Sequence, residues 1–388
     1  MAGRTRRLDR GAHASITIAC LALAAASGCA GPTATGGATA AAKPGVGPAA
    51  VMAPLVYGVP DGADGADLER AVDEMDRGEL ELSIATLQAL RSKRPNNGTV
   101  LHELALAHRM SRQPRRAVEL LLPYREELPP QMLSALASAF DEAGDRDQAE
   151  ALLRQGLARY PKAGVLYSDL GTTVRGAGRL DEALRLYLQG IEAEPSFPGN
   201  YRRAAELYAK GDSRGLALVY GEMFRVLDPA HSVEVSKLLV EVCRDAVVEN
   251  GGKKGDATSA LAPRETYVEV GPGGKLKGPL VPLSWAIELG YGPALIAAHE
   301  KGLSLASLHE ARKMFMVFVA RPGGPFQDYK LALFPWLTAL AAAGHLEAYD
   351  HWLYGAAFPD EMKRWGEKHP KEVEAMASWA HEHPLFGK

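Results

Sequence analysis

The side chains most often used for catalysis and metal binding are concentrated in the last third of the sequence, residues 232–388. This segment holds all five tryptophans and seven of the eleven histidines: Trp285, Trp336, Trp352, Trp365, Trp379, His299, His309, His345, His351, His369, His381 and His383. Together these residue types could line a ligand pocket or hold a metal ion. However, no histidine pair has the His-Glu-x-x-His spacing of a zinc helix, and His381 and His383 would diverge by about 200° on a helix. We therefore predict hydrogen-bonded or solvated histidines, tryptophans in the core, and no metal site.

The sequence also lacks a convincing motif of nucleophilic or phosphate chemistry. Ser-x-x-Lys does not occur, and the Gly-x-Ser-x-Gly run at residues 211–215 does not follow a strand pattern, as a nucleophile elbow requires. A glycine-rich run ending at Lys275 fails as a phosphate loop, because Glu269 stands where a glycine belongs and Leu276 replaces Ser or Thr. We predict no enzyme activity and no cofactor. The alternative is an enzyme or small-ligand receptor in residues 232–388, with the glycine-rich loop as its lid.

Composition narrows the class of protein further. The 388 residues carry 44 Lys and Arg against 47 Asp and Glu, a net charge of −3, which argues against nucleic acid as a partner. The 47% of apolar residues is enough to form a substantial core. Three cysteines are too few for a disulfide framework or a thiolate zinc site, and we expect Cys243 to be a small buried residue.

The N-terminal segment has the pattern of an export signal over residues 1–28. Four arginines within the first ten residues precede a short apolar run, Ile16–Ala26, that leads into Ala-Ser-Gly-Cys. This ending resembles the lipobox of bacterial lipoproteins, although Ala26 stands where Leu is usual. The resemblance implies lipidation of Cys29, and Ala30 implies an outer-membrane address facing the periplasm or the cell surface. Ordinary cleavage without lipidation is the alternative.

Residues 29–65 are expected to form a disordered tether. Between positions 30 and 54, 21 of 25 residues are Gly, Pro, Ala or Thr, which offer little side-chain burial to offset the entropy of ordering. A coil of this length spans about 35 Å, enough to hold a domain away from a membrane surface.

An alanine recurs every 32 to 34 residues, at Ala85, Ala117, Ala149, Ala183 and Ala217. Each of the last four is followed twelve residues later by a proline, at Pro129, Pro161, Pro195 and Pro229. Upstream lie apolar quartets with i, i+3, i+4, i+7 spacing, such as Leu133/Leu136/Ala137/Phe140, which place one apolar stripe along a helix. Gly144 and Gly178 mark turns that need positive φ. In the first unit Pro95 follows Ala85 by only ten residues, so we predict a terminal cap there.

This pattern resembles the tetratricopeptide repeat over residues 66–231. Its best copy reads Tyr167-x2-Leu170-Gly171-x2-Val174, then Gly178, Ala183, Tyr187 and Pro195. The resemblance implies an α-solenoid of about five helix pairs. Small residues let the helices approach closely, and the proline ends each second helix. One pair cannot bury its own stripe, so the pairs must stack.

The first helices of the pairs would line a groove for a protein partner. Helical spacing assigns this inner face to the side chains His102, Leu106, Arg109, Ser134, Ser138, Asp141, Ser168, Thr172, Arg175, Arg202, Glu206 and Lys210. The set is polar and mixed in charge, which suits a peptide or helix of another protein. It lacks the Lys/Asn pattern of the family's carboxylate clamp, so that ligand is not implied.

Residues 232–388 are expected to form a mainly helical domain. We predict a helix over Val233–Asn250, a Gly/Pro-rich loop over 251–282 with a short strand at Thr266–Val270, and further helices. The stretch from Phe334 to Pro359 is similar to a degenerate helix pair. The whole chain is thus predicted to be all-α, and to act as a cell-envelope adaptor or scaffold for an envelope complex.

Overall fold

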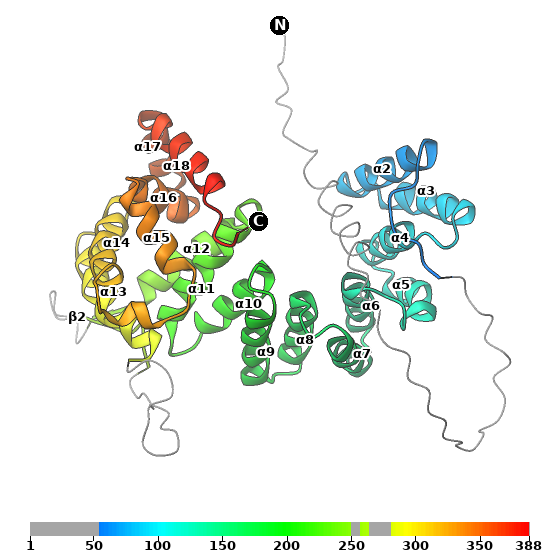
Figure 1. The fold of residues 1–388 in the computed structure, drawn as a ribbon, viewed down its shortest axis with the longest axis horizontal. Coiled ribbons are helices and arrows are strands. Elements are labelled where there is room, and N and C mark those ends of the chain that lie inside the picture. Colours follow the sequence, from blue (N-terminus) through cyan, green and yellow to red (C-terminus); the bar gives the residue numbers. More distant parts are fainter. Residues whose placement is uncertain (1–53, 250–256, 264–280, 388) are drawn as a thin grey trace, which may run out of the picture. The chain divides into compact units, whose positions relative to one another are not determined.

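The computed structural model describes residues 54–249, 257–263 and 281–387 (Figure 1). The predicted export signal, Cys29 and most of the predicted tether lie outside these residues, as does the strand predicted at Thr266–Val270. The chain divides into two compact units, Met1–Thr173 and Val174–Lys388. No helix in the described ranges is long and apolar enough to span a bilayer.

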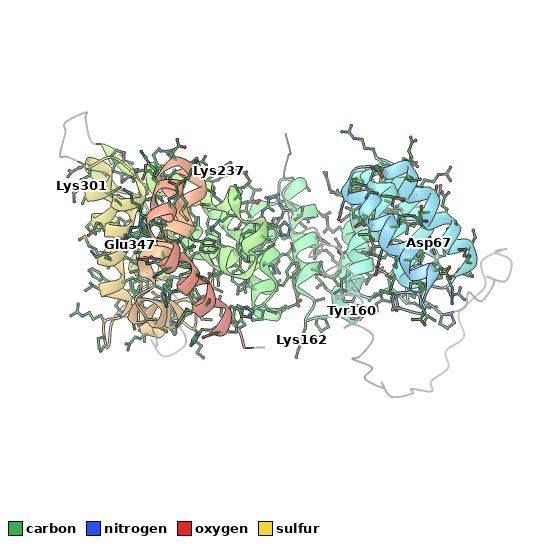
Figure 2. All side chains as sticks on the ribbon, turned by 90° about the horizontal axis from the view of Figure 1, so that it is seen from above. Asp67, Tyr160, Lys162, Lys237, Lys301 and Glu347 are labelled. Carbon is green, nitrogen blue, oxygen red and sulfur yellow. The ribbon has the colours of Figure 1, made fainter. Side chains whose placement is uncertain are left out.

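The first unit is built from helix pairs, as predicted. Its helices are α2 (Ala63–Asp76), α3 (Leu80–Lys93), α4 (Gly98–Met110), α5 (Pro114–Leu121), η1 (Leu122–Tyr124), α6 (Pro130–Glu142), α7 (Arg146–Arg159) and most of α8 (Gly164–Gly176). The first helices begin 32 to 35 residues apart, which confirms the period. Ion pairs also join the two helices of a pair. In the first pair, Oδ2 of Asp67 on α2, marked in Figure 2, lies 3.6 Å from Nζ of Lys93 on α3.

In the first unit, the turn inside each helix pair is made by a left-handed residue. Gly78 and Gly144 have φ of 78° and 90°, and the following amides, Glu79 N and Asp145 N, each donate to a carbonyl five residues back at 2.8 Å. The backbone therefore reverses within three residues, as in a Schellman motif. In the second pair Arg112 takes this place with φ 58°, a conformation that costs a residue with a Cβ about 1–2 kcal/mol.

The predicted apolar stripes form the core of the first unit. Leu101, Leu104, Leu133 and Leu136 are at most 1% exposed. The assignment in the first pair was wrong, because Ala85 is exposed and the buried small residue is Ser83. The Ser83 hydroxyl donates to the Ala71 carbonyl at 2.7 Å, which allows a polar side chain at this tight helix contact. Counted from Ser83, the proline at position 95 comes twelve residues later, so this pair is regular.

The last twelve residues of the predicted tether belong to the folded unit. Val56 pairs in parallel with Asn97, through Val56 N to Asn96 O and Gly98 N to Val56 O, both 2.8 Å. The Tyr57 ring lies so close to Gly98 that a Cβ there would sit 2.4 Å from a ring carbon. Helix α2 then begins at Ala63. The low-complexity composition therefore ends before Val56, and the prediction of a tether up to residue 65 was too long.

The second unit contains the remaining helices. They are α9 (Leu180–Ala193), α10 (Pro198–Tyr208), α11 (Arg214–Leu227), η2 (Pro229–His231), α12 (Val233–Asp245), α13 (Leu283–Glu300), α14 (Leu305–Val319), η4 (Pro325–Asp328), α15 (Leu333–Ala342), α16 (Leu346–Tyr354), η5 (Gly355–Ala357), α17 (Pro359–Lys368) and α18 (Pro370–Glu382). The all-α class is confirmed. The predicted degenerate pair is the hairpin of α15 and α16, whose turn residue Gly344 has φ 82°.

Helix α11 continues the repeats and is also central to the C-terminal helices. A Cβ at its Gly221 would lie 2.7 Å from Leu239 Cδ2 of α12, and a Cβ at its Gly215 would lie 3.0 Å from Ile287 Cγ2 of α13, so both contacts are close. Buried residues from Tyr201 to Met376 form one hydrophobic cluster. The predicted domain boundary at 231/232 therefore runs through a shared core.

A short antiparallel hairpin replaces the end of the helix predicted over Val233–Asn250. Helix α12 ends at Asp245, and β1 (Val247–Glu249) pairs with β2 (Ala257–Ser259). The carboxylate of Glu288 on α13 accepts hydrogen bonds from the Leu261 amide at 2.6 Å, from the Ala262 amide at 3.0 Å and from Ser259. These bonds anchor the hairpin to α13.

Candidate functional site

In the first unit the predicted inner-face residues lie on the first helices. They are His102 and Arg109 on α4, Ser134, Ser138 and Asp141 on α6, and Ser168 and Thr172 on α8. All are partly buried except Ser168, which is 8% exposed. The Thr172 hydroxyl donates to the Ser168 carbonyl at 2.8 Å, so part of its hydrogen-bonding capacity is used within α8.

Arg109 is bound to the next helix pair. Its Nη2 lies 2.6 Å from Glu142 Oε1, and its Nε contacts both carboxylate oxygens. The partner lies 33 residues ahead, one repeat further along the chain. The guanidinium therefore links α4 to α6 through this ion pair, and it does not project unpaired into a groove. Such a pair, partly exposed, contributes about 0–1 kcal/mol, so a ligand carboxylate could displace Glu142 at small cost.

In the second unit three arginines converge on one carboxylate, Glu206 of α10. Arg175 Nη1 lies 3.0 Å from Glu206 Oε2, Arg202 Nε lies 3.1 Å from Oε1, and Arg203 Nη1 lies 3.4 Å from Oε2. We call these four residues the arginine cluster. Their side chains are 26–41% exposed, so they are partly desolvated but reachable from solvent. Lys210, also predicted for this face, is exposed beyond the end of α10.

The electrostatics of the arginine cluster favour an additional anion. Burial alone would raise the pKa of Glu206, but the hydrogen bond from Arg175 and the charges of Arg203 and Arg202 hold it below its ordinary value. Glu206 is thus ionised at neutral pH and balances only one of three positive charges. Guanidinium groups present paired donors that match a carboxylate, so the surplus charge is suited to bind one.

Sequence reasoning found Arg175, Arg202 and Glu206 but missed Glu142 and Arg203. A usable signal existed for Glu142, because Arg109–Glu142 and Arg175–Glu206 have separations of 33 and 31 residues, about one repeat. Arg203 lies three residues before Glu206, a spacing that places both on neighbouring turns of α10.

A buried polar cluster, also missed, joins α11 to the C-terminal helices. Arg312 of α14 forms an ion pair with Glu222 of α11, and its Nε lies 3.7 Å from Asp350 Oδ1 of α16. His309 Nδ1 lies 2.8 Å from Asp350 Oδ2, and the Tyr349 hydroxyl donates to Glu222 at 2.9 Å. Glu222, Arg312 and Asp350 are each at most 3% exposed. Charged residues on the core face of an apolar helix were the only sequence signal.

Burial and pairing shift the pKa values inside this buried polar cluster. Burial raises the pKa of Asp350 to about 6, although the hydrogen bond from His309 opposes the shift. Burial would lower the pKa of His309, but the hydrogen bond and charge of Asp350 reverse this and raise it. Burial of Cys243, as predicted, raises its thiol pKa to about 12 and makes it unreactive.

The aromatic side chains of the C-terminal helices pack on histidines. His351 stacks on Trp365 at 4.2 Å between ring centroids, and Trp365 stacks on His369 at 4.7 Å. Trp365 also donates to Glu347, marked in Figure 2, at 3.3 Å. Trp336 is 8% exposed and donates to the His383 carbonyl at 2.7 Å. These contacts fix α17 and α18 against α15 and α16, which gives the concentration of Trp and His a packing role.

A metal site would favour the alternative function, an enzyme or small-ligand receptor in the C-terminal domain. Within residues 54–249, 257–263 and 281–387, no group of three or more His, Cys, Asp or Glu side chains is placed to hold a metal ion. In the same ranges, several histidines contact a single acidic residue (His102, His231, His309 and His369), and others contact a tryptophan ring (His345, His351 and His383).

The comparisons with known proteins agree with helical repeats. Residues 132–162 match the family model of the tetratricopeptide repeat. A stretch of 67 residues is 37% identical to the small glutamine-rich tetratricopeptide repeat-containing protein 2 of Mycosarcoma maydis. That match covers 17% of this chain and 19% of the relative, so the chain spans about a fifth of the relative's length. The family model therefore identifies one tetratricopeptide repeat at residues 132–162, within the region of regular helix pairs.

Parts of this chain are also similar to solved structures. A crystal structure of MamA is 20% identical, with a TM-score of 0.33 over 41% of this chain and 94% of that one. YrrB, described as a TPR protein with an unusual peptide-binding site, is 16% identical, with a TM-score of 0.31 over 47% and 91%. The TPR2AB-domain:pHSP90 complex of yeast Sti1 is 17% identical, with a TM-score of 0.25 over 45% and 84%.

The two raised pKa values predict that the contribution of Asp350 and His309 to the stability of the second unit is lost as the pH rises. The folded state holds the Asp350 proton more tightly than the unfolded chain, so stability falls between about pH 4 and 6. The raised pKa of His309 extends this loss above the unfolded pKa of histidine. We expect Asp350→Asn to flatten the pH dependence of the unfolding free energy by about 1–3 kcal/mol.

Urea unfolding followed by tryptophan fluorescence measures this effect, because all five tryptophans lie in the second unit. His231→Gln is the matched control, since His231 is an exposed histidine of the second unit that also contacts an acidic residue, Asp228. Equal pH slopes in the original protein and the Asp350→Asn variant would contradict the prediction.

Proposed function

We propose that the chain is a protein-binding adaptor or scaffold whose arginine cluster holds an acidic segment of a partner protein. The observation that carries the proposal is the convergence of Arg175, Arg202 and Arg203 on the single carboxylate of Glu206. An incoming Asp or Glu would share guanidinium donors that are already oriented, so little side-chain entropy is lost on binding. Tetratricopeptide repeats as protein-binding modules support the same function.

The proposal includes a place in the bacterial cell envelope. The basic, apolar and small-residue pattern before Cys29 supports export and lipid attachment there, with the protein held at the outer membrane. The partner would then belong to an envelope complex.

Metabolic labelling with a fatty acid tests the anchor. We expect label on the original protein and none on Cys29→Ser, because the lipid is attached through that thiol. Lys43→Ser serves as a control that changes the same segment without removing the thiol. Equal labelling of the original and Cys29→Ser chains, or no labelling of either, would reject the anchor.

Charge reversal tests the binding surface. We expect Arg175→Glu combined with Arg202→Glu to lose specific partners captured from envelope extract, because the surplus positive charge becomes negative. Arg185→Glu is the matched control, since Arg185 is an exposed arginine of α9 outside the cluster. The captured partner is then purified and its affinity for each variant measured, with a loss of at least about tenfold expected only for the double variant. Unchanged affinity in the double variant would reject the arginine cluster as the binding surface.

A further inference from the structure

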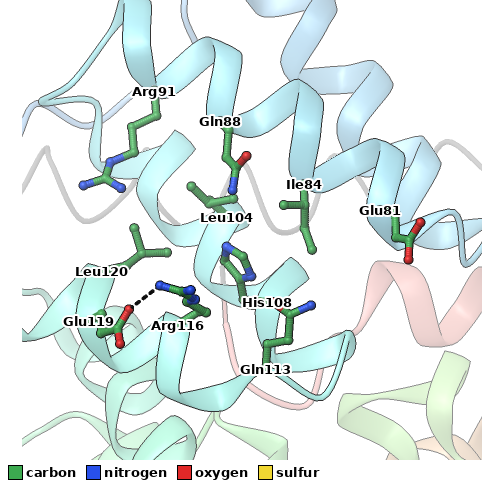
Figure 3. Close-up of a pocket in the computed structure, with 10 residues that line it drawn as sticks. All are labelled: Glu81, Ile84, Gln88, Arg91, Leu104, His108, Gln113, Arg116, Glu119 and Leu120. Carbon is green, nitrogen blue, oxygen red and sulfur yellow. Dashed lines mark hydrogen bonds and ion pairs between the residues drawn. The ribbon is translucent and has the colours of Figure 1, made fainter.

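A pocket of about 650 Å³ lies in the first unit, between α3, α4 and α5 (Figure 3). Its volume falls in the range of small-ligand sites, about 300–1,000 Å³. Ile84, Leu104 and Leu120 give it an apolar part, and Gln88, His108 and Gln113 add hydrogen-bonding groups. In Figure 3, Ile84 and Gln88 project from α3 toward His108, which lies between α3 and Gln113.

The pocket is distinct from the predicted inner face. On α4, the inner-face residues His102 and Arg109 and the pocket residues Leu104 and His108 lie on different sides of the helix, separated by about 100° or more at 100° per residue. The other lining residues come from the second helices α3 and α5. A ligand here would therefore leave the inner face free.

Two charges of opposite sign stand at the ends of this pocket. Figure 3 shows Glu81 at one end of the α3 side and Arg91 at the other. Neither forms an ion pair with the described residues, whereas Glu119, on the Arg91 side, is neutralised by Arg116 at 3.0 Å. Ten helical positions separate Glu81 from Arg91, which corresponds to about 15 Å along α3.

His108 forms part of the buried wall of the pocket. The residue is 6% exposed, and its Nδ1 is fully buried. Burial lowers the pKa of His108, although a hydrogen bond with the Gln113 side chain opposes the shift, so the ring is neutral at pH 7. The exposed side-chain amides of Gln88 and Gln113 are therefore the hydrogen-bonding groups that a ligand can reach.

The geometry points to a binding site for a short aliphatic peptide with free termini. Its ammonium group would lie at Glu81 and its carboxylate at Arg91, with its backbone amides at Gln88 and Gln113. An extended chain gains about 3.3–3.6 Å per residue, so about four residues span the 15 Å between the charges. Aliphatic side chains would cover Ile84 and Leu120. The pocket thus makes the first unit a receptor for free oligopeptides, in addition to the proposed adaptor surface.

Calorimetric titration of the full chain with the tetrapeptide Ala-Leu-Ala-Leu tests this inference. We expect saturable one-to-one binding that C-terminal amidation weakens by at least about tenfold, because the charge-assisted bond to Arg91 is lost. Arg91→Ala should weaken binding of the free peptide equally, and amidation should then have no further effect. N-terminal acetylation and Glu81→Gln should each weaken binding, and acetylation should have no further effect on the affinity of the Glu81→Gln variant.

Arg185→Ala is the control for general charge attraction and should change the affinity less than about twofold. The inference is overturned if no saturable binding occurs up to about 10 mM peptide. It is also overturned if the effects of amidation and Arg91→Ala simply add, or if Arg185→Ala weakens binding as much as Arg91→Ala. Arg175→Glu combined with Arg202→Glu should bind the tetrapeptide normally, so failure of the adaptor proposal can be told apart from failure of this one.

Discussion

The fold depends on burial of the apolar stripe of each helix pair against the next pair. A pair of amphipathic helices exposes one apolar stripe, and a stack of pairs always leaves the last stripe open. In this chain α11 carries that stripe, and α12 and α13 close over it at Gly221 and Gly215. The C-terminal helices are therefore a large cap fused to the repeats, and their position follows from the same burial that stacks the pairs.

The polar residues on α11 make this cap specific. Glu222 and Arg225 are 3% and 4% exposed, and their partners come from the segment after residue 228. Arg225 donates to the carbonyls of Ser232 at 2.8 Å and Trp352 at 2.7 Å. Glu222 forms an ion pair with Arg312 and accepts a hydrogen bond from the Tyr349 hydroxyl. Removing one partner from such a buried pair costs about 3–5 kcal/mol. A different arrangement of the cap would leave these charges unpaired, so the polar contacts select one packing among many apolar ones.

Much of the repeat region could be predicted from the sequence, because its period repeats the same local requirements. The stripe, the small residue, the turn glycine and the final proline placed the helix pairs between α2 and α11. The small residue of the first pair was assigned wrongly because it is a serine and not an alanine. Ser83 is small enough for the helix contact, and its hydroxyl is satisfied by donating to the Ala71 carbonyl. The segment around Val56 was missed because its order depends on a backbone pairing with Asn97, which composition does not encode.

The candidate sites were predictable only in part, for a physical reason. Arg175 and Glu206 could be assigned to one face because both lie on first helices, one repeat apart. The cluster of Glu222, Arg312 and Asp350 joins three helices separated by long stretches of chain, and no spacing rule connects such residues. The pocket around His108 arises from second helices as well as α4, so an analysis of first helices alone could not find it.

Hydrogen exchange on a chain that ends at residue 231 tests the central claim most directly. If the C-terminal helices complete the core of the last repeat, α11 amides in the shortened chain should lose at least about a hundredfold of their protection, while α4 and α6 keep theirs. A shortened chain in which α11 stays as protected as in the full protein would show that the repeats close without the cap, and would contradict the account.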